Sequence, residues 1–283
     1  MTTQQEQFKT KEHDNWSRAA SAWNKYDAHN QRLFAPVTER MLVVAAVGAG
    51  QRVLDIACGT GEPAIPAALQ VGPTGSVLAT DFSEDMLAVA RRKARDRGLT
   101  NLELRRVDGE EVELGEAFDT VLIRFGIMFM PDALACLTRS YRALRTGGRI
   151  AVATWAAVDR NPWLGIALAA IKRHVEIPAP PPGAPGLFTY ADPTKLRSTL
   201  EAAGFSELRI DEVPFKITGF TPTDYFRYIT ELSAPLSALL AKATPDARRA
   251  IESDATAAFG EHAFGGTVSL DAVAWVACGQ RTR

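Results

Sequence analysis

Apolar and polar positions alternate along the chain in a way that predicts strands separated by helices between residues 52 and 155. The first strand is expected at residues 52–57, where Val53, Leu54 and Ile56 form a branched apolar run. Such a run is typical of a parallel strand that is covered on both faces. Further strands are expected at residues 76–81, 102–108, 119–125 and 149–155. This order predicts an α/β fold with an open, doubly wound, mostly parallel sheet.

Helices are predicted between and after these strands. They are expected at residues 62–71, 84–97, 131–145, 158–177 and 193–203, with two or three more within 222–262. Ser83 is a favourable N-cap, and Gly98 ends the helix that Ser83 begins. Alternating residues at 207–215 and an apolar run at 271–279 predict two further strands, seven in all.

The N-terminal region is predicted to be helical ahead of the first strand. Residues 1–12 are polar and are expected to fray, whereas residues 15–47 carry apolar side chains at helical spacing. Trp16, Trp23 and Tyr26 share one helical face with two alanines. These aromatic side chains either anchor the helix to the core or form a lid over a substrate.

Four regions follow from this pattern. They are an N-terminal helical lid at 1–48, a ligand-binding core at 49–157, a cap insertion at 158–192, and the end of the core sheet at 193–283 with a helical insertion at about 222–262. A proline-rich stretch at 178–186 lies within the cap insertion. It is expected to be a stiff surface loop, either a plain connection or the rim of a substrate channel.

Composition and charge narrow the class of protein. The 283 residues are 46% hydrophobic, and 32 basic residues nearly balance 33 acidic ones. A net charge of −1 gives no general attraction to nucleic acid or to an anionic membrane. The start of the chain is polar, and no apolar run is long enough to span a membrane. The three cysteines, Cys58, Cys136 and Cys278, are widely spaced, which predicts a cytoplasmic protein without disulfides or a zinc site.

The stretch after the first strand carries the chemistry. Cys58-Gly59-Thr60-Gly61 predicts a tight turn whose backbone can approach a ligand, followed by a helix N-terminus. Gly59-x-Gly61-x-x-Ala64 with Asp81 fits the dinucleotide fingerprint. Asp55, four residues before Gly59, also fits a D-x-x-x-G-x-G pattern.

On this pattern the chain resembles the class I S-adenosylmethionine-dependent methyltransferases, in the group that resembles the ubiquinone and menaquinone biosynthesis enzymes. Matches at four separate strand ends, in the family's order, support the resemblance; T-G-G-R before the fifth strand is the last of them. It implies S-adenosylmethionine as cofactor, with contacts from Asp55, Ala57, Gly59, Gly61, Asp81, Phe82, Met86, Asp108, Gly109, Glu110 and Arg124. Ala57 replaces the family's usual first glycine, a small departure because alanine still leaves room. The resemblance also implies that the strands at 207–215 and 271–279 pair as an antiparallel hairpin at the end of the sheet.

The resemblance implies a role for each strand end. The glycine turn lies under the methionine part of the cofactor, and Asp81 binds both ribose hydroxyls. Phe82 and Met86 flank the adenine, and Asp108 reaches its amino group. Asp81 is therefore expected to serve the ligand and not the core.

The end of the fourth strand, Arg124 to Asp132, resembles the R-F-G-x-M-F-x-P-D sequence of some bacterial small-molecule members. It differs from the N-P-P-Y type that acts on amino groups and nucleobases. Arg124 is a candidate to orient the cofactor loop, to meet an anionic substrate, or to pair with an acid. The basic residues between Arg91 and Arg97 are interpreted as a solvated helix face.

Methyl transfer from a sulfonium is an in-line displacement that needs alignment and exclusion of water, so no catalytic triad or metal is expected. A general base would help with a hydroxyl or a carbon acid as acceptor. The candidates are His29, His174 and His262, each with a structural role as the alternative. His29 is preferred because it follows the expected lid.

The sequence thus predicts methyl transfer to an O, N or C atom of a small, partly apolar molecule such as a quinol, a phenol or a secondary metabolite. An NAD(P)-dependent oxidoreductase is a second hypothesis, although no tyrosine has a lysine four residues on. A non-catalytic S-adenosylmethionine-binding module is a third. A small-molecule substrate is the expected partner, with no nucleic acid, and both a monomer and a homodimer remain open.

Overall fold

The strands of the chain are defined in a computed structural model, which describes residues 3–115, 117–177 and 183–282. They are β1 (Arg52–Ile56), β2 (Ser76–Asp81), β3 (Leu102–Arg106), β4 (Phe118–Arg124), β5 (Leu144–Trp155), β6 (Ser206–Thr218), β7 (Ala263–Phe264) and β8 (Thr267–Gln280). Every strand expected from the sequence is present, with ends that differ by a few residues. The last strand starts earlier than predicted, and β7 was not predicted.

The helices fill the intervals between the strands. They are α1 (Thr3–Lys25), α2 (Asp27–Val44), α3 (Ala64–Val71), α4 (Glu84–Asp96), α5 (Ala133–Ala143), α6 (Pro162–Lys172), α7 (Pro193–Ala202), α8 (Pro222–Leu232), α9 (Ala234–Ala241) and α10 (Pro245–Gly260), with short 3-10 turns η1 (Ile127–Phe129) and η2 (Val158–Arg160). None of the helices within the described ranges is long and apolar enough to cross a membrane.

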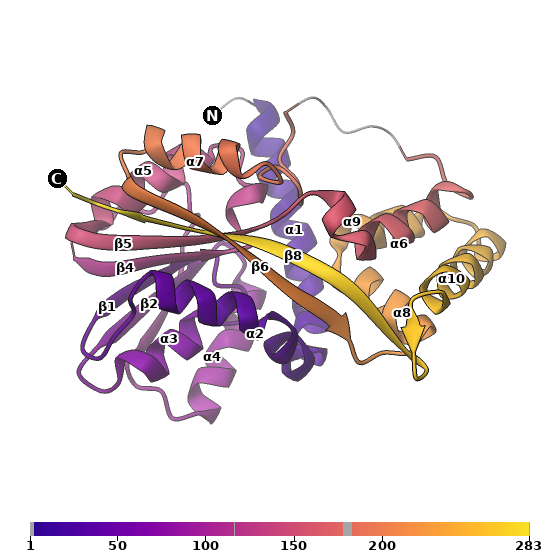
Figure 1. The fold of residues 1–283 in the computed structure, drawn as a ribbon, viewed down its shortest axis with the longest axis horizontal. Coiled ribbons are helices and arrows are strands. Elements are labelled where there is room, and N and C mark those ends of the chain that lie inside the picture. Colours follow the sequence, from indigo (N-terminus) through magenta and orange to yellow (C-terminus); the bar gives the residue numbers. More distant parts are fainter. Residues whose placement is uncertain (1–2, 116, 178–182, 283) are drawn as a thin grey trace.

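The sheet has the strand order β3-β2-β1-β4-β5-β8-β6, and β7 pairs with β8 beside this path. Strands β1 to β5 pair in parallel, whereas β8 runs antiparallel to both β5 and β6. Helices α2, α3 and α4 lie on one side of the sheet and α5 and α7 on the other (Figure 1). The doubly wound sheet with an antiparallel closing hairpin is therefore confirmed. In such a sheet the carboxyl ends of the parallel strands form the ligand-binding edge.

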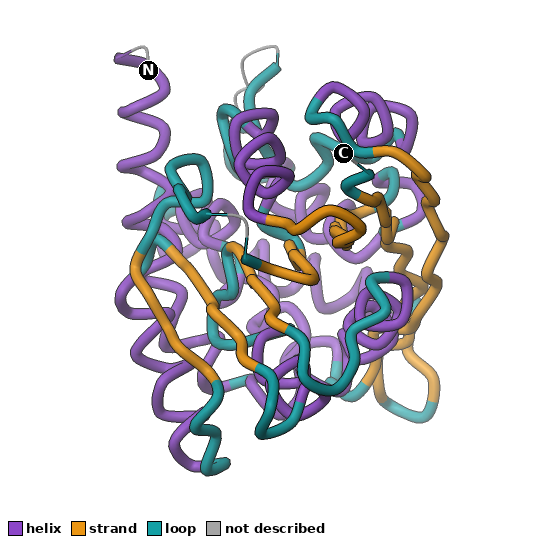
Figure 2. Tube along the Cα trace, turned by 90° about the vertical axis from the view of Figure 1, so that its left-hand side faces the viewer, coloured by secondary structure: helices purple, strands orange, loops and turns teal. Residues whose placement is uncertain are grey.

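The N-terminal helices differ from the prediction at their start. Residues expected to fray belong to α1, the helix that begins at Thr3 near the N-terminus marked in Figure 2. This helix packs against α4. Its polar side chains find partners: Lys9 reaches acids after β3, and Ser17 Oγ lies 3.0 Å from Ser83 Oγ. The helical pattern is also broken at Tyr26, which separates α1 from α2.

Several helix starts are fixed by side chains that cap backbone N–H groups. Ser83 Oγ accepts from Met86 N at the start of α4, as predicted. Asp132, Asp192, Thr221 and Thr244 do the same for α5, α7, α8 and α10. Such caps satisfy donors that a helix cannot pair internally, and they fix where each helix enters the fold.

The cap helices α6, α8, α9 and α10 gather around the far end of the β6–β8 hairpin, away from β1 to β4 (Figure 1). β8 pairs with β5 only from Ala274 to Gln280, and its earlier part pairs with β6. The hairpin therefore leaves the sheet as a two-stranded arm. Part of the proline-rich loop, residues 178–182, lies outside the described residues, so its predicted role stays untested.

Asn161 joins the cap to the sheet where this arm departs. Its side chain is fully buried; Nδ2 donates to the carbonyls of Ala156 (3.1 Å) and Val273 (3.0 Å). Oδ1 accepts from Val273 N at 3.0 Å and from Trp163 Nε1 at 3.3 Å. One amide thus satisfies buried backbone groups on β8 and directly after β5, and an indole on α6.

We predict that Asn161→Leu lowers the free energy of unfolding by about 3 kcal/mol or more, because several buried polar groups lose their partner. Urea denaturation followed by circular dichroism measures this. The same substitution at Asn24, on the exposed surface of α1, is the control and should cost less than about 0.5 kcal/mol. Equal losses for the two variants would contradict this role of Asn161.

Candidate functional site

The glycine turn after β1 adopts the left-handed backbone that its sequence predicts. Gly59 has φ +53° and Gly61 has φ +100°. A Cβ on Gly59 would meet no atom within 4 Å, whereas one on Gly61 would lie 2.8 Å from Ile65 Cδ1. Gly61 is thus required by packing, and Gly59 leaves open space beside the backbone. Ala57 has φ +58°, in the left-handed region that favours glycine. Alanine in place of the family's usual glycine therefore costs about 1–2 kcal/mol of backbone strain, and this strain matters more here than space for the methyl group.

Asp81 ends β2 and holds this turn in place. Its Oδ2 accepts from Gly59 N at 2.8 Å and its Oδ1 accepts from Ser83 N at 2.9 Å. Burial raises the pKa of Asp81 to about 6, although these backbone donors oppose the rise. The expectation that Asp81 serves only a ligand was wrong, because the carboxylate also fixes two backbone segments. Each oxygen keeps a second acceptor position for a ligand.

Helix α1 covers the end of β2. The Phe82 ring contacts His13 edge-on at 5.7 Å. Met86 is buried against Ala19 and Ala20, with Trp16 and Trp23 packed around them. The two side chains expected to flank an adenine therefore lie at the interface between α1 and α4, and α1 is part of the candidate site.

The acids after β3 are neutralised by a residue that the sequence reading passed over. Lys9 Nζ lies 2.7 Å from Asp108 Oδ2 and 2.5 Å from Glu110 Oε2. Glu110 Oε1 also accepts from Asp132 N at 2.6 Å, which ties this loop to the start of α5. A Cβ on Gly109 would lie 2.8 Å from Ile56 Cγ2, so glycine there is a packing requirement. Of the two acids, Asp108 has the carboxylate that is more available to a ligand, with 25% of its side chain exposed against 5% for Glu110.

Asp55 in β1 and Arg124 at the end of β4 influence each other electrostatically beside the glycine turn. Asp55 is fully buried, and neither of its oxygens has a hydrogen-bond partner among the described residues. Burial raises the pKa of Asp55 well above its usual range, and the Arg124 charge opposes this. Arg124 Nη1 donates to Thr38 Oγ1 at 3.1 Å, while its buried Nε lacks a partner within the described chain. Burial lowers the pKa of Arg124, and Glu62 and Asp55 oppose that shift. Unpartnered groups of both signs are the environment that a zwitterionic ligand would satisfy.

His29 lies on α2, in an aromatic cluster against the cap. Its ring centroid is 4.3 Å from that of Phe220 and 5.4 Å from that of Tyr228. Burial lowers the pKa of His29, with Arg32 as a smaller cause, and its buried Nε2 lacks a hydrogen-bond partner in the described chain. His174, another candidate base, instead forms a hydrogen bond with Asp254 at 3.0 Å on the cap. The structure thus brings His29 beside α8 and leaves His174 on a distant surface pair.

The three aromatic residues expected to form a lid contact different parts of the fold. Trp16 meets Phe129, just after β4, at 5.3 Å between ring centroids. Trp23 packs beside Trp16 at 6.4 Å. Tyr26 contacts Tyr228 of α8 at 5.0 Å. Together they place α1 across the carboxyl ends of β2 and β4 and beside the cap, where a lid would have to lie.

Lys93 is the second residue that the sequence reading missed. It belongs to the basic run expected to face solvent, but it is only 8% exposed. Its Nζ lies 2.5 Å from Asp27 Oδ1 and donates to the Thr60 carbonyl at 2.8 Å. Lys93 therefore links the glycine turn to the start of α2. Arg92, Arg95 and Arg97 of the same run are exposed, as predicted.

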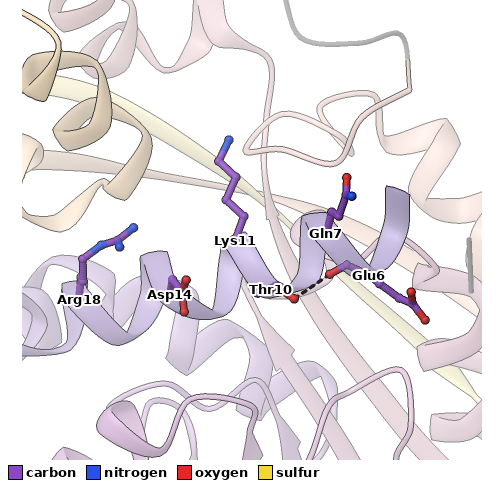
Figure 3. A pocket seen from close by; sticks show the side chains of 6 residues that line it. All are labelled: Glu6, Gln7, Thr10, Lys11, Asp14 and Arg18. Carbon is purple, nitrogen blue, oxygen red and sulfur yellow. Dashed lines mark hydrogen bonds between the residues drawn. The ribbon is translucent and has the colours of Figure 1, made fainter. Parts of the chain in front are cut away.

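Two surface hollows lie outside the candidate site. One, of about 440 Å³, follows the outward face of α1 and is lined by Glu6, Gln7, Thr10, Lys11, Asp14 and Arg18 (Figure 3). Another, of about 670 Å³, includes Arg52, Ser76, Leu102 and Phe118 at the amino ends of four strands. Neither includes a residue expected to bind the cofactor. These two hollows therefore belong to other parts of the surface, whereas α1 covers the candidate site through its contacts with Phe82, Met86 and Phe129.

Curated relatives match less than half of the chain. An aklanonic acid methyltransferase of Streptomyces sp. strain C5 is 38% identical over 127 residues, which cover 44% of this chain and 58% of the relative. A demethylmenaquinone methyltransferase of Oceanobacillus iheyensis is 41% identical over 107 residues, 37% of this chain and 44% of the relative. The chain spans about half the length of the curated relatives it matches.

Solved structures share the fold over most of the chain. A methyltransferase structure from Bacillus halodurans C-125, described as putative, has a TM-score of 0.56 at 20% identity, and the match covers 87% of this chain and 99% of that one. A phosphoethanolamine N-methyltransferase of Haemonchus contortus in complex with S-adenosyl-L-methionine has a TM-score of 0.53 at 18% identity, over 87% of this chain and 52% of that one.

The family itself is shown by a model that matches more than half of the chain. The matched residues, 21–171, run from α1 through α6 and contain the glycine turn, Asp81 and the end of β4. The resemblance noted from the sequence is thereby confirmed. This chain belongs to the ubiE/COQ5 methyltransferase family.

Proposed function

We propose that this protein transfers a methyl group from S-adenosylmethionine to an O, N or C atom of a small, partly apolar molecule of the quinol, phenol or secondary-metabolite class. The observation that carries the proposal is the buried Asp81 carboxylate, which fixes the glycine turn and keeps two acceptor positions at the ligand-binding edge of the sheet. Relatives named for aklanonic acid and demethylmenaquinone support the class of acceptor. We also propose a cytoplasmic location and no nucleic-acid partner.

The residues present fit the cofactor in charge and in shape. The open space beside Gly59 admits a close ligand, and the unpartnered Asp55 carboxyl group and Arg124 Nε suit the amino and carboxylate groups of its methionine part. The two free acceptor positions of Asp81 suit a pair of ribose hydroxyls. Asp108 would take the adenine amino group, in the position where Lys9 now contributes its ammonium.

The reaction requires little chemistry from the chain itself. S-adenosylmethionine supplies a methyl group on a sulfonium whose leaving group is neutral. The chain's contribution is alignment and exclusion of water, which α1 provides by covering the site through Trp16, Trp23 and Tyr26. His29 is our candidate base. The lowered pKa of His29 keeps its ring neutral at pH 7, so Nε2 can accept a proton from a hydroxyl.

Isothermal titration calorimetry with S-adenosylhomocysteine and with NAD, in parallel, tests the proposal. We expect binding of S-adenosylhomocysteine and none of NAD. Incubation with methyl-labelled S-adenosylmethionine and a panel of naphthols and quinols should then give labelled product that extracts into an organic phase. Binding of NAD alone would overturn the proposal, and binding of S-adenosylhomocysteine without transfer to any acceptor would favour a non-catalytic module.

The pH dependence of cofactor binding tests Asp81. Ribose hydroxyls donate to the ionised carboxylate, so binding favours the charged form and lowers the pKa of Asp81 from its free value of about 6. The affinity for S-adenosylhomocysteine should be constant above pH 7 and should fall by up to about tenfold per pH unit below pH 6. Calorimetry between pH 5 and 8 measures this.

Asp81→Asn is the matched control for that pH dependence. It keeps a side-chain oxygen but has no proton to gain, so its affinity should be lower than wild type at pH 8 and flat between pH 5 and 7. A wild-type affinity that does not change with pH, or a variant that keeps the full wild-type pH dependence, would remove Asp81 from the ribose site.

Lys93 is predicted to support cofactor binding by holding the glycine turn. Lys93→Met leaves the Asp27 carboxylate without its cation and frees the Thr60 carbonyl. Loss of one partner of a mostly buried pair costs about 3 kcal/mol, so we expect both lower stability and a roughly tenfold or greater loss of S-adenosylhomocysteine affinity. Arg95→Met, at an exposed position of the same helix, should change neither quantity, and a matching loss in that variant would contradict the role given to Lys93.

A further inference from the structure

Asn30 presents a buried polar group that the fold leaves without a partner. The residue is 5% exposed, and its Oδ1 accepts a hydrogen bond from the Tyr228 hydroxyl at 2.6 Å. Its Nδ2 has no hydrogen-bond partner among the described residues. An unsatisfied buried donor costs about 1–3 kcal/mol, so such a group in a folded protein points to a missing partner.

The surroundings of Asn30 are aromatic. The ring of Tyr228 stacks on Phe220 at 4.7 Å, and Tyr26 meets Tyr228 edge-on at 5.0 Å. Tyr225 contacts Tyr228 at 5.8 Å and carries a second buried hydroxyl that finds no partner within the described chain. Flat apolar walls with a few unpaired polar groups are typical of a site for a small aromatic ligand.

Asn30 also lies close to the cofactor end of the sheet. Phe34 and Thr38 follow it at intervals of four residues, so the three share a face of α2. Arg124, at the end of β4, lies over the Phe34 ring and donates to Thr38. Three residues before Asn30, Asp27 binds Lys93 and through it the glycine turn. The unpaired Nδ2 group of Asn30 therefore lies between the glycine turn and the cap.

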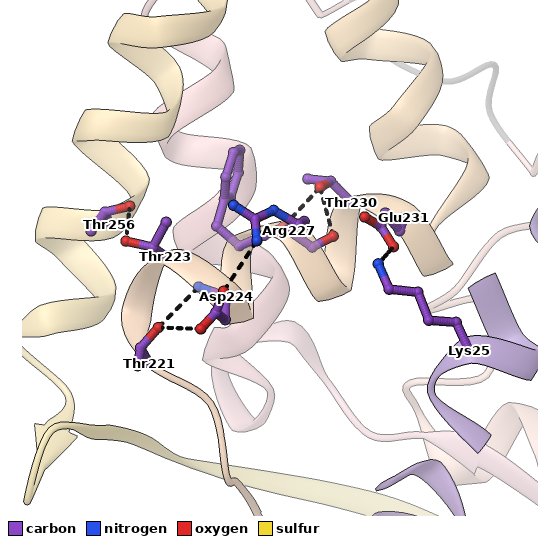
Figure 4. Close-up of polar contacts among 9 residues, drawn as sticks. Lys25, Thr221, Thr223, Asp224, Arg227, Thr230, Glu231 and Thr256 are labelled. Carbon is purple, nitrogen blue, oxygen red and sulfur yellow. Dashed lines mark hydrogen bonds and ion pairs between the residues drawn. The ribbon is translucent and has the colours of Figure 1, made fainter. Parts of the chain in front are cut away.

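The cap holds this part of the site from the other side. Lys25 at the end of α1 pairs with Glu231 of α8 at 2.7 Å (Figure 4). In a separate contact, Thr256 Oγ1 of α10 lies 3.5 Å from Thr223 Oγ1 of α8. Tyr228 lies on the same helix as Glu231, one turn earlier. The N-terminal helices and α8 thus approach each other at Asn30, so a ligand there would contact both.

We propose that the Asn30 Nδ2 group donates a hydrogen bond to a carbonyl oxygen attached to the ring system of the methyl acceptor. The Tyr228 hydroxyl donates to Asn30 Oδ1 and so holds the amide in the orientation that presents this donor. The acceptor would be a flat aromatic molecule whose oxygen accepts a hydrogen bond, such as an aryl ketone or a quinone carbonyl. This proposal rests on the proposed methyl transfer. It names residues for the methyl-acceptor site, which the proposed function leaves unassigned.

The test compares two ligands that differ by one oxygen, 1-tetralone and tetralin, by equilibrium dialysis against the full chain with and without S-adenosylhomocysteine. The measured quantity is the ratio of the two dissociation constants, in which the common hydrocarbon contribution cancels. Asn30→Asp keeps an oxygen for Tyr228 but replaces the free donor by an acceptor. The preference for the ketone over the hydrocarbon should then fall roughly fivefold or more relative to wild type.

Two further variants keep the result interpretable. Asn24→Asp makes the same chemical change on exposed α1 and should leave the ratio unchanged. The double variant Asn30→Leu with Tyr228→Phe removes donor and acceptor together and leaves no orphaned group, so it should fold and should also lose the ketone preference. Thermal unfolding confirms that each variant is native.

The outcomes are distinct. An unchanged ratio in Asn30→Asp, or no binding of either compound to the wild type, overturns the acceptor site. Loss of the ketone preference in a protein that binds no S-adenosylhomocysteine would leave the aromatic site standing and would refute the proposed methyl transfer. Binding of S-adenosylhomocysteine with no effect of Asn30 would do the reverse.

Discussion

A turn made of glycines cannot hold itself in place, and the site depends on how this one is fixed. Gly59 and Gly61 contribute no side chain that could anchor them. The anchors come from other elements: the Asp81 carboxylate binds Gly59 N, and the Lys93 ammonium binds the Thr60 carbonyl. Both anchors are charged and mostly buried, which makes each bond strong and its loss costly. The same charges position β2, α4 and α2 around the turn, because Asp81 ends β2 and Lys93 of α4 also binds Asp27 at the start of α2.

Much of this arrangement could be predicted from the sequence, because it depends on local patterns. The branched run of β1, the N-cap Ser83 and the glycine turn each specify their structure within a few residues. Lys9 and Lys93 could not be placed in this way. Each looks like an ordinary polar residue of a helix, and its role appears only when distant acids approach: Asp108 and Glu110 for Lys9, Asp27 for Lys93. An ion pair between residues far apart in the sequence produces no periodic pattern, so it cannot be recognised from one sequence.

Polar side chains of α1, the helix that covers the site, meet groups of opposite charge or of matching hydrogen-bonding capacity. Lys9 brings a positive charge to two acids after β3, and Ser17 meets Ser83 at the cap of α4. These polar contacts are replaceable by ligand groups of similar chemistry, whereas the apolar contacts of Trp16, Ala19 and Ala20 with Met86 and one another hold α1 against α4. The polar N-terminal residues were expected to fray, but α1 is ordered from Thr3. Lys9 and Ser17 have partners that lie far along the sequence, at Asp108 and Ser83.

The arm formed by β6 and β8 connects the cap helices to the sheet. The family match ends at residue 171, close to where the chain leaves the sheet for the cap, and Asn161 sits at that border. Of the cap helices, all but the last residue of α6 falls within the matched residues, whereas α8, α9 and α10 lie beyond them. Because the arm holds these three helices away from β1 to β4, a change in their length or packing would leave the parallel strands and the glycine turn in place. The long hairpin thus acts as a spacer that mechanically separates the two halves of the molecule.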